Sequence, residues 1–118
     1  MAHTESTYIS LETHGRATVA RIECEKLANR EAQVIEAELN AEGEKCAFRL
    51  VVDLSQVTML PSIGLGMLVS LHRKCKEKAG RLAICNLSPD LLNVLKLTHL
   101  DRLLTICKDR EAAIKTVQ

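Results

Sequence analysis

The chain has 118 residues and a formal net charge of +1, with 47% hydrophobic, 26% charged and 2% aromatic residues. This length fits a single domain over residues 1–118, large enough to bury a sufficient core without metal or disulfide staples. The balanced charge, without a long basic stripe or aromatic stacking residues, argues against direct binding of nucleic acid, and no apolar run reaches the roughly 18 residues of a membrane span.

The chemistry-bearing residues suggest neither a cofactor nor a metal. Five cysteines are an odd number without C-x-x-C spacing, so they indicate neither a disulfide framework nor a zinc site. The four histidines are scattered, and no two have the i, i+4 spacing of a metal-binding helix. The first seven residues are polar and lack the apolar segment of a secretory signal, so we expect a cytoplasmic protein.

The first elements are predicted as a hairpin and a helix. Residues 8–13 and 17–23 are rich in β-branched residues and flank His14-Gly15-Arg16, a pattern typical of two strands joined by a turn. Asn29 is predicted to cap a helix that runs from position 30 to about Asn40. A connector containing Gly43 then leads to the next strand.

The central strand is predicted over residues 48–54, because it is apolar at nearly every position, as in a strand buried on both faces of a sheet. After a loop, Ser62 is predicted as the N-cap of a helix that runs from Ile63 to about Lys78. Ala79-Gly80 is its predicted stop.

The second half of the chain continues the alternation of strand and helix. It comprises a strand over 81–85, a helix capped by Ser88 that runs to about Leu97, a strand over 103–107, and a terminal helix capped by Asp109. The order β-β-α-β-α-β-α-β-α predicts an α/β sandwich with a mixed, mostly parallel sheet of about five strands and about four helices.

Four segments of the chain carry a resemblance to a known family. They are Val52-Asp53-Leu54-Ser55, Leu60-Pro61-Ser62-Ile63-Gly64-Leu65-Gly66, residues 80–89 and residues 95–104. In this order they cover most of the chain, which resembles the STAS domain of anti-sigma factor antagonists, also called anti-anti-sigma factors. The resemblance implies a STAS-like sandwich fold.

The same resemblance implies a phosphorylation site. The family loop typically reads Asp-Ser-Ser-Gly or Asp-Ser-Ala-Gly, with the serine after the Asp as phosphoacceptor, and that serine is Ser62 here. This sequence departs from the pattern, because Pro61 replaces the Asp and Ile63 replaces the second small residue. Asp53 and Ser55 are expected to support the loop. From the residue alone, a plain helix cap is the favoured reading of Ser62, and the resemblance brings the phosphorylation site level with it, so both readings stay open.

The helix after Ser62 has two apolar stripes at helical spacing. One is expected to pack on the sheet and comprises Met67, Leu68, Leu71 and Cys75. The other is expected either to contact a partner or to pack against a neighbouring helix of this domain. Together with the loop it forms the predicted partner-binding set, which comprises Pro61, Ser62, Ile63, Gly64, Leu65, Val69 and His72.

Three functions follow as hypotheses. The leading one is a non-enzymatic anti-sigma factor antagonist that binds an anti-sigma factor with serine kinase activity, frees a sigma factor and is released by phosphorylation of Ser62. The alternative is a constitutive STAS docking subunit of a transporter or signalling complex that is never phosphorylated. An enzyme is the third, although no acid, base and nucleophile converge in the sequence. A weak homodimer is an additional open expectation.

Overall fold

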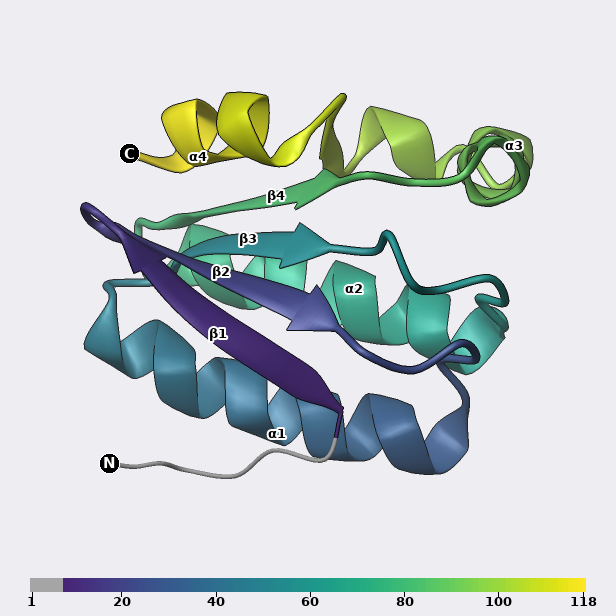
Figure 1. Ribbon diagram of the computed structural model, residues 1–118, viewed down its shortest axis with the longest axis horizontal. Coiled ribbons are helices and arrows are strands. Elements are labelled where there is room, and N and C mark those ends of the chain that lie inside the picture. The colour runs from purple at the N-terminus through teal and green to yellow at the C-terminus, as the bar shows by residue number, and fades with distance from the viewer. Residues whose placement is uncertain (1–7) are drawn as a thin grey trace.

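The computed structural model describes residues 8–118, and its centre is a five-stranded sheet (Figure 1). The strands are β1 (Ile9–His14), β2 (Ala17–Ile22), β3 (Arg49–Asp53), β4 (Arg81–Cys85) and β5 (Thr105–Cys107). They lie in the order β1-β2-β3-β4-β5, and β1 pairs antiparallel with β2, whereas the other neighbours are parallel. The predicted mixed, mostly parallel sheet is confirmed.

Four α-helices and one short 3-10 helix complete the described part of the chain. They are α1 (Asn29–Lys45), α2 (Ser62–Glu77), α3 (Pro89–Leu97), η1 (Leu100–Arg102) and α4 (Arg110–Val117). Figure 1 shows α1 and α2 on one side of the sheet and α4 on the other. This is the predicted α/β sandwich.

Alternating side chains of the strands divide the core between the two faces of the sheet. Leu50 and Val52 of β3 and Leu82 and Ile84 of β4 belong to a large buried cluster that includes residues of α1, α2 and α3. These large aliphatic side chains fill the space between the sheet and the helices that pack on this face. The bulk of the core therefore lies on this face.

Smaller side chains line the opposite face, where α4 packs. Val51, Ala83 and Cys85 form a second buried cluster with Ala113 and Val117 of α4. Because these side chains are short, the helix can approach the sheet closely. Strand β3 is thus covered on both faces, as its continuous apolar sequence predicted.

Helix α1 extends further than the sequence indicated. The predicted end near Asn40 and the connector role of Gly43 are wrong, because the helix continues through Gly43. That glycine is buried under the Phe48 ring, which would overlap a Cβ atom there, so it serves packing rather than chain reversal. The predicted Asn29 cap is also wrong, since Ala28 occupies the N-cap position without a side-chain hydrogen bond.

Two predicted helix caps are confirmed. The Leu91 amide donates to Ser88 Oγ at 3.2 Å, and the Ala112 amide donates to Asp109 Oδ1 at 2.9 Å.

The last strand, β5, is shorter than the predicted range 103–107, because the residue after η1 still has a helical backbone.

The predicted stop of α2 at Ala79-Gly80 is confirmed, and its two residues differ in role. Ala79 takes the left-handed conformation, with φ of +61°. Gly80 donates its amide to the Cys75 carbonyl oxygen at 2.8 Å, and a Cβ atom on it would overlap the Phe48 carbonyl oxygen. Gly80 therefore permits a close backbone contact, whereas Ala79 bears the conformational cost.

We expect Ala79→Gly and Gly80→Ala to change the free energy of unfolding in opposite directions. Ala79→Gly removes a left-handed alanine and should stabilise the fold by about 0.5–1 kcal/mol. Gly80→Ala forces a methyl group against backbone and should destabilise it by more than about 1 kcal/mol. Urea denaturation measures both changes, and a Gly80→Ala variant as stable as the wild type would contradict the close contact with Phe48.

Candidate functional site

The loop between β3 and α2, residues 54–61, lies at the carboxyl edge of the parallel strands (Figure 1). Leu54, Val57 and Leu60 are buried and anchor it to the core. The Leu54 amide also donates to the Cys85 carbonyl oxygen at 3.0 Å, which continues the pairing of β3 with β4. These contacts therefore hold the loop against the core and the end of the sheet.

A second loop, between β2 and α1, pairs with the first. The amides of Thr58 and Met59 both donate to the Glu25 carbonyl oxygen, at 2.8 and 2.9 Å, and the Leu27 amide donates to the Met59 carbonyl oxygen at 3.1 Å. Glu25 and Lys26 are exposed, so the two loops present one continuous surface. The sequence predicted a connector at residues 26–29 but not its pairing with the first loop, because main-chain hydrogen bonds do not depend on a recognisable residue pattern.

The prediction that Ser62 caps α2 is wrong. Pro61 occupies the N-cap position with an extended backbone (φ −66°, ψ 172°), and Ser62 is the first helical residue. The Leu65 amide donates to the Pro61 carbonyl oxygen at 3.0 Å, so the amides of Ser62, Ile63 and Gly64 precede the first bond of the helix. The exposed Ser62 side chain thus stands at the positive end of the helix dipole, and the first turn contains no acidic residue.

Apolar side chains flank Ser62 at the surface. Met59 is 55% exposed and Ile63 is 43% exposed. Leu65, Val69 and His72, the second predicted stripe, are half-buried, and Leu65 packs against the main core. The structure therefore brings the loop and the first turn of α2 together as an exposed apolar patch, with the second stripe partly covered by the domain itself.

The imidazole of His72 is biased towards its neutral form. Partial burial lowers its pKa, and repulsion from Lys76 and Arg73 lowers it further. The lowered pKa reduces the charge that this stripe would present to a partner.

Gly64 and Gly66 differ in what the fold requires of them. A Cβ atom on Gly64 would lie 2.6 Å from the Leu27 carbonyl oxygen, so the glycine lets α2 touch the loop between β2 and α1. A Cβ atom on Gly66 would have no neighbour within 4 Å. Gly66 therefore leaves open space on the exposed side of α2.

The opposite face of α2 is buried as predicted. Met67, Leu68, Leu71 and Cys75 all lie in the main core. Burial raises the pKa of the Cys75 thiol to about 12, and burial also raises that of Cys85 to about 12. Neither thiol is disposed to ionise. In residues 8–118 no group of three or more His, Cys, Asp or Glu could hold a metal ion.

Asp53 lies at the base of the loop, at the end of β3, and is 3% exposed. Its Oδ1 accepts the Ser55 amide at 2.9 Å, and its Oδ2 accepts Arg110 Nη2 at 3.0 Å. Burial by itself would raise the pKa of Asp53, but hydrogen bonds from Ser55, Arg110 and Asn86 outweigh burial and hold the pKa below its usual value. Sequence analysis missed Arg110, which approaches Asp53 from α4.

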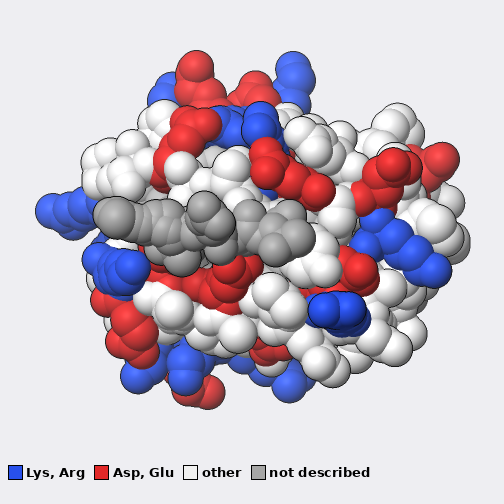
Figure 2. Space-filling view, turned by 60° about the horizontal axis from the view of Figure 1, so that its bottom comes forward, with Lys and Arg blue, Asp and Glu red and all other residues white. Residues whose placement is uncertain are grey.

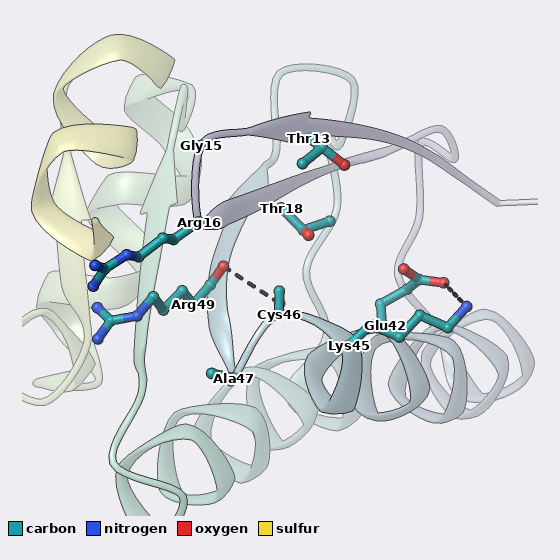
Figure 3. A pocket seen from close by; sticks show the side chains of 9 residues that line it. All are labelled: Thr13, Gly15, Arg16, Thr18, Glu42, Lys45, Cys46, Ala47 and Arg49. Atoms are coloured by element: carbon teal, nitrogen blue, oxygen red, sulfur yellow. Dashed lines mark hydrogen bonds and ion pairs between the residues drawn. The ribbon is translucent and has the colours of Figure 1, made fainter.

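A hollow of about 420 Å³ lies at the opposite edge of the sheet, between the β1–β2 turn and the end of α1 (Figure 3). Two of its basic side chains already have partners. Arg49 Nη1 donates to the Val117 carbonyl oxygen at 2.9 Å, and Lys45 Nζ pairs with Glu42 Oε2 at 3.2 Å. None of the predicted site residues lines it, so the candidate site is the Ser62 loop.

Charge is mixed over the face drawn in Figure 2, where acidic and basic side chains are interspersed. None of the helices in residues 8–118 is long and apolar enough to cross a membrane.

Comparisons with known proteins agree on one family. Residues 8–113 match the family model of the STAS domain. Over 82 residues the chain is 29% identical to BtrV of Bordetella bronchiseptica, whose name describes a candidate anti-sigma factor antagonist, and the match covers 70% of this chain and 71% of BtrV.

Two solved structures share the fold. An anti-sigma-factor antagonist (STAS) domain protein from Planctomyces limnophilus has a TM-score of 0.81 at 23% identity, with 92% of this chain and 96% of that chain covered. The Bacillus cell fate determinant SpoIIAA, solved in its phosphorylated form, has a TM-score of 0.69 at 20% identity, with 92% and 98% covered. At these identities the likeness concerns the fold alone.

The two glycines of α2 should respond differently to alanine. Gly66→Ala adds a methyl group in open space and improves helix propensity, so it should raise the free energy of unfolding by about 0.5–1 kcal/mol. Gly64→Ala should lower it, because the new Cβ atom meets a backbone carbonyl of the neighbouring loop. Thermal and urea unfolding of the two variants test this difference, and equal effects would contradict the contact with Leu27.

The carboxylate of Asp53 should make stability depend on pH. Because its pKa is lower in the folded state, its stabilising contribution is present above the unfolded pKa of about 4 and disappears as the pH falls through the folded-state value. Asp53→Asn should therefore lower the free energy of unfolding by about 1–3 kcal/mol at pH 7. The difference in this free energy between the variant and the wild type should shrink at acidic pH. Urea denaturation from pH 7 down to pH 3 tests this, with Asp90→Asn, an exposed carboxylate on α3, as the matched control. A difference that stays constant with pH would contradict the lowered pKa.

Proposed function

The chain belongs to the STAS domain family, and from this premise we propose that it is an anti-sigma factor antagonist. In this role it binds an anti-sigma factor with serine kinase activity and thereby frees a sigma factor, without catalysing a reaction itself. The observation that carries the proposal is the exposed Ser62 at the start of α2, at the position of the family phosphoacceptor and beside an exposed apolar patch.

The proposed binding surface combines the two paired loops with the start of α2. Met59 and Ile63 supply apolar area that a partner can remove from water, and Glu25 and Lys26 supply a charged rim. Exposed apolar side chains gathered in one patch are typical of interaction sites. The surface also includes the predicted partner-binding residues, namely Pro61, Ser62, Ile63, Gly64, Leu65, Val69 and His72.

Within this set, Gly64 and Leu65 contribute mainly by position. Gly64 is buried against Leu27, and Leu65 packs on the core. They hold the start of α2 against the second loop and so keep Ser62 and Ile63 together at the surface. Asp53 and Ser55 support the loop from its other end through their hydrogen bond.

Phosphorylation of Ser62 would switch the interaction off. A phosphate adds about 1.5 to 2 negative charges and three acceptor oxygens. The start of a helix accommodates such charge well, so the fold should not change. A partner that covers the patch would have to desolvate the dianion, and only about 1.4 kcal/mol of this cost weakens binding tenfold.

The alternative is a constitutive docking subunit of a transporter or signalling complex. Its support comes from Pro61 and Ile63, because a kinase that reads the usual acidic neighbour would meet a proline, and Ile63 enlarges the apolar patch. In this alternative the same surface binds a partner, but Ser62 is never modified.

We expect Ser62→Asp to abolish capture of the anti-sigma kinase, whereas the wild type and Ser62→Ala retain it. The measurement is affinity capture from lysate of the source organism, followed by mass spectrometry of the bound proteins and of phosphate on Ser62. Ser70→Asp is the matched control, because it adds the same charge to an exposed residue of α2, two helical turns and about 12 Å further along.

The outcomes separate the two proposals. Capture of a kinase-type anti-sigma factor that is lost only with Ser62→Asp, together with phosphate on Ser62, supports the sigma switch. Recovery of one transporter or signalling assembly by every variant, with Ser62 unmodified, would instead establish constitutive docking.

A further inference from the structure

We propose that Arg110, on the C-terminal helix, is a positioning residue for the loop that carries Ser62. The consequence for binding rests on the proposed function, whereas the consequence for the loop itself does not. The argument follows a chain of contacts from α4 through Asp53 to the first turn of the loop.

The two oxygens of the Asp53 carboxylate hold two different elements. Oδ1 accepts the Ser55 amide at 2.9 Å, at the start of the loop, and Oδ2 accepts Arg110 Nη2 at 3.0 Å. The Asp53 side chain is only 4% exposed, so water can do little to replace a lost partner. The orientation of this carboxylate, and with it the first turn of the loop, therefore depends on Arg110.

The guanidinium of Arg110 is itself held in place by a second carboxylate. Nη1 donates to Glu12 Oε2 of β1 at 2.9 Å, while Nη2 donates to Asp53. The fork geometry of arginine allows both bonds at once, and a lysine ammonium could not reproduce it. Arg110 thus joins the edge strand, the C-terminal helix and the end of β3.

The place of Arg110 in α4 is not one that helix stability would favour. It is the first residue of the helix, where the positive end of the dipole disfavours a cation. The neighbouring Asp109 cap and Glu111 are the acidic residues that this position favours. The ion pairs with Glu12 and Asp53, rather than α4 itself, account for an arginine here.

Different hydrogen bonds hold the two ends of the loop. The later part is fixed by the hydrogen bonds of Thr58 and Met59 to Glu25. The earlier part depends on the Ser55 bond to Asp53 and on a bond from the Val57 amide to the Leu54 carbonyl oxygen at 3.1 Å. Loss of Arg110 should therefore loosen the first turn of the loop and leave its contact with the second loop in place.

The test compares Arg110→Met with Arg49→Met. Arg49 also ties α4 to the sheet, but through the Val117 carbonyl oxygen at the other end of the helix, and it has no contact with Asp53. Amide hydrogen exchange measured by NMR should show faster exchange at Ser55 by about tenfold in Arg110→Met and no change there in Arg49→Met. The Thr58 and Met59 amides should keep the wild-type rate in both variants. The double variant Arg110→Met/Asp53→Asn should show the same exchange rate at the Ser55 amide as Arg110→Met alone.

Equal acceleration of Ser55 exchange in Arg110→Met and Arg49→Met would overturn the proposal, because Arg110 would then act only through the general docking of α4. Affinity for the captured partner should fall several-fold in Arg110→Met alone. If Ser62→Asp abolishes binding but Arg110→Met leaves affinity unchanged, the positioning role in binding is wrong. If Ser62→Asp has no effect on binding, the proposed function fails, and the Ser55 exchange result still decides the structural role of Arg110.

Discussion

Burial of strand β3 on both faces is the constraint on which the rest of the structure depends. Leu50, Val51 and Val52 are fully buried, and each contributes about 1.5–3 kcal/mol through the apolar surface it removes from water. Their alternation requires helices on both sides of the sheet, with α1 and α2 on one and α4 on the other. The charged side chains of β3 are therefore found at the ends of the strand, and Asp53 lies at its carboxyl end.

The direction of the parallel strands then places the proposed binding surface. Because β2, β3 and β4 are parallel, the segments that follow them all leave the sheet at the same edge. Main-chain hydrogen bonds join the first two of these segments through Glu25 and Met59, and Asp53 joins the second to α4. Three parts of the fold therefore hold the surface around Ser62 in place, even though it consists mainly of loop.

The features that the sequence predicted well depend on local periodicity or local capping. The buried stripe of α2, the continuous apolar run of β3 and the caps Ser88 and Asp109 are of this kind. The N-cap predictions for Asn29 and Ser62 failed by a single residue, a shift that local sequence patterns do not resolve. Other features stay hidden in the sequence because they depend on packing. Gly43 resembles a helix stop until the Phe48 ring is placed over it, and Arg110 resembles an ordinary surface cation until the fold brings Asp53 and Glu12 to it.

The position of Ser62 relative to Pro61 bears directly on whether an anion suits this site. An N-cap serine would use its hydroxyl to accept an amide of the first turn, and modification would sacrifice that bond. Ser62 is instead the first helical residue, so its hydroxyl is not needed as the N-cap acceptor. Replacement of the family Asp by Pro61 also removes a carboxylate that would repel a phosphate at the start of α2. The substitution therefore makes the helix terminus electrostatically more receptive to a phosphoserine, which is the modification that the proposed function requires.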